Sequence, residues 1–173
     1  QASINAGTLI VTFVGHAATT QWAQEGLFKT SDVAGLANAG KLPVMLPMTC
    51  REGYYHHPHD LADQRESLAE IVTRAEGKGA VASWSPTGLG VASGHHYLST
   101  GFFKALFQAR VGTVGLAAIA GQLDLWLTGG SRELIDTYPL FGDPATQIEV
   151  LEADLQVAKS VEPAGTVRPG DLL

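Results

Sequence analysis

The segment Leu42-Pro-Val-Met-Leu-Pro-Met-Thr-Cys50 decides the fold class of this chain. Its apolar residues 42–48 are typical of a central strand in a parallel sheet, which is buried on both faces and shows no polar alternation. Pro47 is unusual there, because proline cannot donate a hydrogen bond to a neighbouring strand. A second run, Thr8-Leu-Ile-Val-Thr-Phe-Val14, has the same apolar, β-branched character and ends at Gly15. Both runs predict strands.

Expected helices alternate with these strands along the chain. Residues 60–76 place apolar side chains on one helical face, with Asp60 as the N-cap. A third strand is expected over residues 79–84. The other expected helices cover residues 32–39, 96–109 and 112–128, the last of them apolar enough to be largely buried. Strands alternating with helices predict an α/β fold with a mostly parallel sheet covered by helices.

The composition excludes several classes of protein. Of the 173 residues, 45% are hydrophobic and 16% charged, so the chain can bury a core and is not a disordered sequence. The net charge of −6 and the lack of a Lys/Arg cluster argue against nucleic acid as a partner. No apolar run reaches the roughly 18 residues of a membrane span. The single cysteine excludes an internal disulfide, and the glycine spacing of residues 88–94 fits no nucleotide-binding loop.

Two chemically active side chains follow the first two strands, His16 after residues 8–14 and Cys50 after residues 42–48. The carboxyl ends of parallel strands meet at one edge of a sheet, where ligands bind in such folds. If the two strands are neighbours, imidazole and thiol project from the same edge. A thiol needs a nearby base or cation to become a reactive thiolate, so the pair is a candidate nucleophile and base. The alternative is that Cys50 is a small buried apolar residue.

Three histidines and Asp60 crowd residues 54–60, shortly after the candidate nucleophile. A transition-metal site is conceivable there, but the spacing fits neither a helical histidine pair nor a zinc pattern. A loop that borders the cleft is therefore favoured. His95 and His96 are expected at the solvated start of a helix. Asp143, in a Gly-Asp-Pro sequence, is expected to cap the amides of a turn.

The segment Val14-Gly-His-Ala17, together with residues 42–50, resembles the gingipain-type cysteine peptidases of the caspase-like clan. Three further motifs match in the same order: Glu66-Ser-Leu-Ala-Glu70, Gly79-Ala-Val-Ala-Ser83 and Tyr138-Pro-Leu-Phe-Gly-Asp-Pro-Ala145. The resemblance covers about residues 8–150 and rests on the ordered set rather than on any one motif. It implies a caspase-like three-layer α/β/α sandwich, completed by an N-terminal segment or a second chain.

The resemblance also implies roles for single residues. Cys50 is the implied nucleophile, which forms an acyl-enzyme, and His16 the implied general acid–base. The backbone N–H groups of Cys50 and Ala17 are the implied oxyanion hole. Ala17 stands where the family usually has glycine, which is tolerable if its φ is negative. The implied substrate pocket is formed by Ser83, Trp84 and Ser85, although Trp84 fits a core position equally well.

The domain organisation and the partners are implied by the same resemblance. Residues 1–154 are expected to form the C-terminal part of the peptidase domain, followed by a tail or linker over 155–173. The expected partners are a peptide or protein substrate and the N-terminal fragment of the same precursor, separated by autoprocessing just before Gln1. No cofactor is required, although structural calcium is compatible with the family. A secreted or cell-surface location follows from the resemblance alone.

Two other functions stay open at the level of sequence. A caspase-like module without catalysis, serving as a binding or scaffolding partner, fits the alanine that follows His16. A flavodoxin-like ligand-binding domain would leave Cys50 inert and bind its ligand where the strand order switches. The reactivity of the thiol near neutral pH discriminates between these functions and a peptidase.

Overall fold

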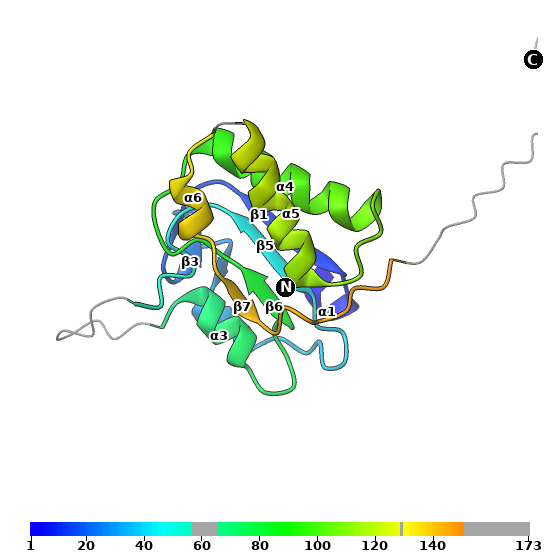
Figure 1. The fold of residues 1–173 in the computed structure, drawn as a ribbon. Helices are drawn as coiled ribbons and strands as arrows, with labels where there is room; N and C mark the ends of the chain where they lie inside the picture. The colour runs from blue at the N-terminus through cyan, green and yellow to red at the C-terminus, as the bar shows by residue number, and fades with distance from the viewer. Residues whose placement is uncertain (57–65, 129, 151–173) are drawn as a thin grey trace, which may run out of the picture.

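The computed structural model describes residues 1–56, 66–128 and 130–150, and its centre is a four-stranded sheet (Figure 1). The strands lie in the order β1 (Ile10–Val14), β5 (Val44–Met48), β6 (Ala82–Trp84) and β7 (Leu140–Gly142). The first three are parallel, and β7 is antiparallel to β6. The predicted mostly parallel α/β sheet is therefore confirmed. The tail expected from residue 155 lies outside the described residues.

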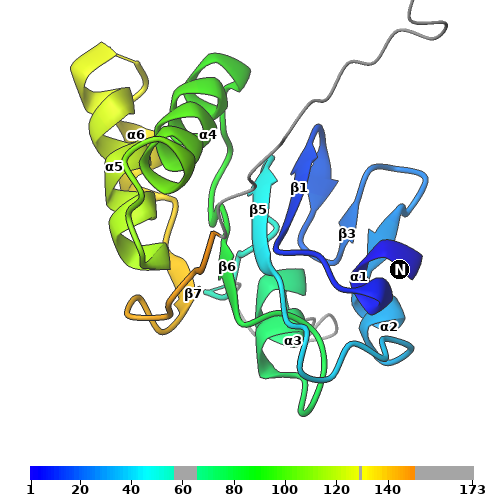
Figure 2. The same ribbon diagram turned by 90° about the vertical axis from the view of Figure 1, so that its right-hand side faces the viewer.

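Helices cover both faces of this sheet, as Figure 2 shows. One face carries the two long helices α4 (Ala92–Phe107) and α5 (Val114–Thr128). The other face carries α3 (Leu68–Arg74) and α2 (Thr30–Val33). Two further short helices are α1 (Ala2–Ala6) and α6 (Glu133–Asp136). The result is the expected arrangement of a sheet between two helical layers.

Strand β5 is buried over its whole length and separates two apolar cores. Successive side chains of a strand point to opposite faces of the sheet. Val44, Leu46 and Met48 accordingly join the core under α4 and α5. Met45 joins the second core, which lies under α3. A strand with apolar neighbours on both faces needs a continuous apolar run, as residues 42–48 provide.

Pro47 fits inside β5 because its backbone points away from β1. The carbonyl of the preceding residue, Leu46, faces β1 and accepts a hydrogen bond from the hydroxyl of Thr12 at 2.9 Å. Alternation turns Pro47 toward β6, whose pairing with β5 ends at Met45. The missing N–H therefore costs no ladder hydrogen bond, and the Pro47 carbonyl instead accepts from the hydroxyl of Tyr138 at 3.3 Å.

A small antiparallel sheet that the sequence did not predict follows β1. It consists of β2 (Ala17–Ala18), β3 (Gln21–Trp22) and β4 (Phe28–Lys29). Trp22 stacks on Phe13 of β1 with ring centroids 5.0 Å apart, and its ring lies 5.3 Å from that of Phe28. Strands of two residues show no periodicity, so this hairpin is fixed by the packing of Trp22 rather than by a local pattern.

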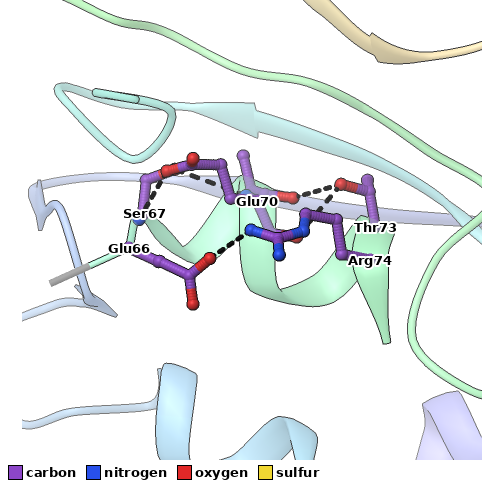
Figure 3. A network of polar contacts seen from close by, with 6 residues as sticks. Glu66, Ser67, Glu70, Thr73 and Arg74 are labelled. Carbon is purple, nitrogen blue, oxygen red and sulfur yellow. Dashed lines mark hydrogen bonds and ion pairs between the residues drawn. The ribbon is translucent and has the colours of Figure 1, made fainter. Parts of the chain in front are cut away.

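Of the helix expected over residues 60–76, the structure describes the part from residue 66, where α3 begins after its N-cap Ser67; the expected N-cap, Asp60, lies outside the described residues. The hydroxyl of Ser67 accepts a hydrogen bond from the Glu70 N–H at 3.3 Å, and the Glu70 carboxylate accepts from the Ser67 N–H at 2.9 Å (Figure 3). This reciprocal capping box fixes the start of α3. An ion pair between Glu66 and Arg74 joins the approach to the helix to its last turn.

Two other expected helices have different boundaries. The one expected over residues 32–39 is only the four-residue α2. The one expected from residue 96 begins at Ala92, so His95 lies inside α4 rather than before it. His95 is 6% exposed, and the expectation of a solvated side chain was therefore wrong for His95, whereas His96 is exposed.

Helix α5 is not largely buried, contrary to the expectation from its composition. Its inner side approaches α4 closely, because a Cβ on Gly121 would lie 2.5 Å from the carbonyl oxygen of Leu98. A Cβ on Gly101 of α4 would likewise lie 2.8 Å from the carbonyl oxygen of Ala120. Only the side of α5 that carries Gly121 is covered by α4. The outer side leaves five large apolar residues exposed: Leu116, Ile119, Leu123, Trp126 and Leu127.

Candidate active site

Strand register sets His16 and Cys50 at matching positions on the carboxyl edge of the sheet. Val14 of β1 is the register partner of Met48 of β5, and each candidate residue follows its strand by two positions. The N–H of Gly15 donates to the Met48 carbonyl at 3.3 Å, which extends the pairing beyond the strand. The expectation that these two strands are neighbours is confirmed. His16 is exposed and Cys50 half-buried, so both can be reached from solvent.

The thiol of Cys50 lies against the loop that follows β6. Its Sγ accepts a hydrogen bond from the Gly90 N–H at 3.3 Å and lies 3.8 Å from the Gly90 carbonyl oxygen. Further along, the N–H of Gly53 donates to the carbonyl of Pro86 at 2.8 Å. Residues 86–90 therefore run beside the segment that carries the thiol, and Gly90 rather than His16 is the hydrogen-bond partner of the sulfur.

Arg51, directly after the thiol, has a left-handed backbone with φ of 56°. This conformation costs a residue with a side chain about 1 kcal/mol or more, and it persists only where the surroundings enforce it. Here the N–H of Arg51 donates to the Gly88 carbonyl at 2.9 Å. The strained residue turns the chain away from β5 immediately after Cys50.

Ala17 adopts a backbone conformation that alanine tolerates. It begins β2 directly after His16 and pairs with Trp22 of β3. The described non-glycine residues with positive φ are Ala23, Arg51 and Arg110. Ala17 is not among them, so it carries none of the strain that a glycine-only conformation would impose. An alanine at position 17 was expected to be tolerated if its φ is not positive, and the structure meets this condition.

Tyr138 holds the end of β5, a role that the sequence analysis did not assign. Its hydroxyl accepts a hydrogen bond from the Thr49 N–H at 3.3 Å and lies 3.3 Å from the carbonyl oxygens of Pro47 and Thr49. The ring is 1% exposed, and burial raises the pKa of the hydroxyl above its usual range. The neutral hydroxyl both donates and accepts, so it fixes the backbone immediately before Cys50.

Ser83, Trp84 and Ser85 lie in the interior rather than on an open surface. The indole N–H of Trp84 donates to the Tyr138 carbonyl at 2.9 Å, and its ring stacks on Phe102 of α4 at 5.7 Å. The hydroxyl oxygens of the two serines are 2.6 Å apart. The structure thus gives Trp84 the core position that the sequence left open, and nothing in it supports stacking on a substrate side chain.

A buried acid, Glu52, lies two positions after Cys50 and is 0% exposed. Burial raises the pKa of its carboxyl group to about 7, an effect that the nearby Ser85 hydroxyl and Trp22 indole N–H reduce. Neither group reaches full hydrogen-bond geometry, because both carboxyl oxygens and the Trp22 Nε1 lack a partner. The sequence alone does not reveal Glu52 as a site residue, since nothing in Arg-Glu-Gly distinguishes a buried glutamate from a solvated one.

Three further expectations concern residues around the site. In the part of the chain that the structure describes, no three His, Cys, Asp or Glu side chains lie together, and no residue set for calcium can be named there. Much of the histidine-rich segment 54–60 lies outside that part.

The described helices include none long and apolar enough to cross a membrane. Asp143 accepts a hydrogen bond from the Ala145 N–H at 2.8 Å, which confirms the expected turn cap.

Several solved structures share this fold. The Arg-specific cysteine proteinase gingipain R matches with a TM-score of 0.76 and 23% identity over 86% of this chain and 35% of its own. The complex of RgpB pro- and mature domains from Porphyromonas gingivalis matches with a TM-score of 0.73 and 23% identity, over 82% and 34%. A structure described as a protease matches with a TM-score of 0.74 and 20% identity, over 83% and 36%. The chain thus spans about a third of the length of these relatives.

The comparison at the level of sequence gives the family. No curated protein matches the chain. The profile of peptidase family C25 matches residues 1–149, which is most of the chain and includes His16 and Cys50. The fold similarity to gingipain R is independent of that match and confirms the caspase-like α/β sandwich. The chain therefore belongs to peptidase family C25, the gingipain family of cysteine peptidases.

Proposed function

We propose that this chain carries the catalytic residues of a cysteine endopeptidase, with Cys50 as nucleophile and His16 as general acid–base. The observation that carries the proposal is the register of β1 and β5, which sets the two residues at matching positions on one sheet edge. Membership in a family of cysteine peptidases supports the same class of reaction. Both residues are open to solvent, as attack on a polypeptide substrate requires.

The reaction proceeds through an acyl-enzyme. His16 takes the thiol proton, and the thiolate of Cys50 attacks the carbonyl carbon of the scissile peptide bond. The tetrahedral intermediate collapses as the imidazolium of His16 gives its proton to the leaving amine, which leaves a thioester on Cys50. Water, deprotonated by His16, then attacks the thioester, and the carboxylic acid product leaves with the thiol restored.

Backbone amides stabilise the two negative charges that develop. The N–H groups of Cys50 and Ala17 donate to the oxyanion of the tetrahedral intermediate. The N–H of Gly90 already donates to Sγ at 3.3 Å, and a hydrogen bond to an anion is stronger than one to a neutral acceptor. The same contact therefore stabilises the thiolate more than the thiol, which lowers the cost of forming the nucleophile.

The properties of the longer relatives are part of the proposal. One relative is described as Arg-specific and another as a complex of pro- and mature domains. By analogy, the peptidase acts on a peptide or protein, arises by autoprocessing and keeps an N-terminal fragment of its precursor as a partner. A secreted or cell-surface location completes the proposal. Residue preference is not transferred, because Ser83, Trp84 and Ser85 are buried.

A non-catalytic module is the second candidate function. The observation that favours it is the hydrogen bonding of Sγ, which involves Gly90 rather than the imidazole of His16. In that case the thiol is a structural group that ties the end of β5 to the loop after β6. Such a thiol would react slowly with electrophiles near neutral pH, whereas an activated one reacts fast.

The test is covalent labelling of Cys50 by a pool of electrophilic peptide probes, followed by intact mass spectrometry. Cys50 is the only cysteine, so one probe adduct is expected on the protein and none on Cys50→Ala. His16→Ala should be labelled far more slowly, whereas His96→Ala, which changes another exposed histidine, should match the unaltered protein. Failure of the whole pool to label the unaltered protein would favour the non-catalytic module.

A further inference from the structure

Glu52 is a buried acid in contact with both segments that carry the candidate catalytic residues. Its own segment includes Cys50, two positions earlier. Its carboxyl group lies near the indole N–H of Trp22, in β3, and near the hydroxyl of Ser85, directly after β6. Trp22 is the register partner of Ala17, the residue next to His16. One carboxyl group thus faces the hairpin of His16 and the strand beside β5 at the same time.

The backbone around Glu52 joins the same segments. Its carbonyl accepts a hydrogen bond from the Ala69 N–H at 3.3 Å, in the first turn of α3. The neighbouring Leu68 N–H donates to the carbonyl of Thr19, in the turn between β2 and β3, at 2.8 Å. The start of α3 therefore holds both the Glu52 segment and the His16 hairpin. Among the residues that the structure describes, Glu52 is the one acidic side chain in the buried set.

The carboxyl group of Glu52 is fully buried, so it does not act as a solvated charge on the surface. A buried polar group without a full hydrogen bond costs about 1–3 kcal/mol, so an apolar residue would stabilise the fold better. Both carboxyl oxygens of Glu52 and the nearby Nε1 of Trp22 are buried without a hydrogen-bond partner. Buried polar groups that cost stability are concentrated at functional sites.

We propose that Glu52 is a positioning residue that couples the His16 hairpin to the Cys50 segment, through the indole N–H of Trp22 and the hydroxyl of Ser85. This inference rests on the proposed function of Cys50 and His16. Glu52 does not touch the substrate. Its carboxyl group lies between the Trp22 indole N–H and the Ser85 hydroxyl, so a charged carboxylate attracts a donor on each side and sets how closely the hairpin that carries His16 approaches the thiol.

The coupling depends on the charge of the carboxyl group. The carboxylate has two acceptor oxygens and can serve Trp22 and Ser85 together, whereas the carboxylic acid uses one oxygen as a donor. Tyr138, from the approach to β7, is a titratable group close enough to interact electrostatically with both Glu52 and Cys50. Since burial raises the carboxyl pKa to about 7, the coupling is complete above that pH and weakens below it.

The first measurement follows the indole N–H resonance of Trp22 by NMR as the pH is raised. A charged acceptor strengthens the hydrogen bond, so the resonance should move with a midpoint near pH 7. In Glu52→Gln the movement should vanish, while Trp84 and Trp126 act as internal controls. Glu76→Gln, which alters an exposed glutamate, should leave the titration unchanged. A Trp22 resonance that is flat in the unaltered protein, or that still titrates in Glu52→Gln, overturns the proposal.

The second measurement is the rate at which iodoacetamide alkylates Cys50, as a function of pH. The profile of the unaltered protein should contain one ionisation more, near pH 7, than that of Glu52→Gln. At pH 8 the Glu52→Gln rate should be roughly tenfold lower, since a hydrogen bond to a charged group contributes about 1.5 kcal/mol. Trp22→Phe keeps the aromatic packing but removes the donor, so its profile should shift to higher pH.

The two measurements separate the inference from the function on which it rests. If the unaltered protein reacts fast and Glu52→Gln gives the same pH profile, Glu52 is only structural and the inference alone fails. If the thiol of the unaltered protein is unreactive at every pH while Trp22 still titrates with Glu52, the proposed peptidase function fails, and a positioning role in catalysis fails with it.

Discussion

Gly90 contacts Cys50 on one side and His95 on the other. Its N–H donates a hydrogen bond to Sγ of Cys50 at 3.3 Å, and a Cβ added to it would lie 2.2 Å from Nε2 of His95. His95 is buried, its ring lies 5.7 Å from that of Tyr138, and burial lowers its pKa. The imidazole therefore stays neutral and has little room to move. A side chain at position 90 would therefore have to displace either the His95 ring or the loop that reaches the thiol.

Gly90→Ala should reduce the reactivity of Cys50. The new methyl group must displace either the loop or the His95 ring, and the displaced loop no longer donates its N–H to the sulfur. The rate of labelling by a peptide probe near neutral pH should fall roughly tenfold, the effect of one lost hydrogen bond to a charged group. Gly112→Ala is the matched control, because nothing lies within 4 Å of its added Cβ. Equal rates in the two variants would contradict the role of the loop.

Tyr138→Phe should destabilise the fold while keeping its shape. The phenyl ring fills the same space, but the N–H of Thr49 loses its acceptor. An unsatisfied buried N–H costs about 1–3 kcal/mol, which urea unfolding monitored by circular dichroism can measure. Tyr55→Phe serves as control, since Tyr55 is 52% exposed and should change the free energy of unfolding by less than about 0.5 kcal/mol. A Tyr138→Phe protein of unchanged stability would contradict the hydrogen bonding described for β5.

The buried carboxyl of Glu52 should make stability depend on pH in an unusual direction. Its pKa rises from 4.5 to about 7 on folding, so the folded chain holds a proton that the unfolded chain releases between these values. The contribution of this proton to the free energy of unfolding is complete below pH 4.5. As the pH rises to about 7 it is lost, and the free energy of unfolding falls by up to about 3 kcal/mol. Glu52→Gln should not show this loss and should be the more stable protein at pH 8. Urea unfolding at several pH values tests this, with Glu76→Gln expected to decline like the unaltered protein.

Ser67→Ala should weaken the start of α3. It removes the hydroxyl that accepts from the Glu70 N–H and leaves the other half of the capping box without its partner (Figure 3). The expected loss in the free energy of unfolding is about 1 kcal/mol. Ser93→Ala changes an exposed serine of α4 and should have little effect. If both variants unfold at the same urea concentration, the capping box does not stabilise the fold.

The sequence predicted those parts of the fold that a local pattern encodes. The continuous apolar runs correctly predicted β1 and β5, and with them the neighbouring positions of His16 and Cys50. The parallel direction of these strands was also open to prediction, since parallel strands joined through a crossover expose their carboxyl ends at one edge, whereas their register comes from the structure.

The parts that were missed depend on tertiary packing. The two-residue strands β2 to β4 exist because Trp22 packs between Phe13 and Phe28, which no local pattern reveals. The burial of Glu52 and of His95 likewise depends on which segments meet around them. Trp84 has the same amino-acid neighbours in the chain whether it faces a substrate or a core, and only the structure placed it beneath α4.

If His16 activates the thiol of Cys50, the thiol must react fast at a pH where an ordinary cysteine does not, so the decisive measurement is the alkylation rate at pH 6. An unassisted thiol, with a pKa of about 8.5, is almost entirely protonated at pH 6 and reacts slowly with iodoacetamide. Fast alkylation is expected in the unaltered protein and in His96→Ala, and a rate at least roughly tenfold lower is expected in His16→Ala, which lacks the base. An alkylation rate in His16→Ala equal to that of the unaltered protein would show that His16 does not activate the thiol, because the imidazole would then have no influence on the reactivity of the sulfur.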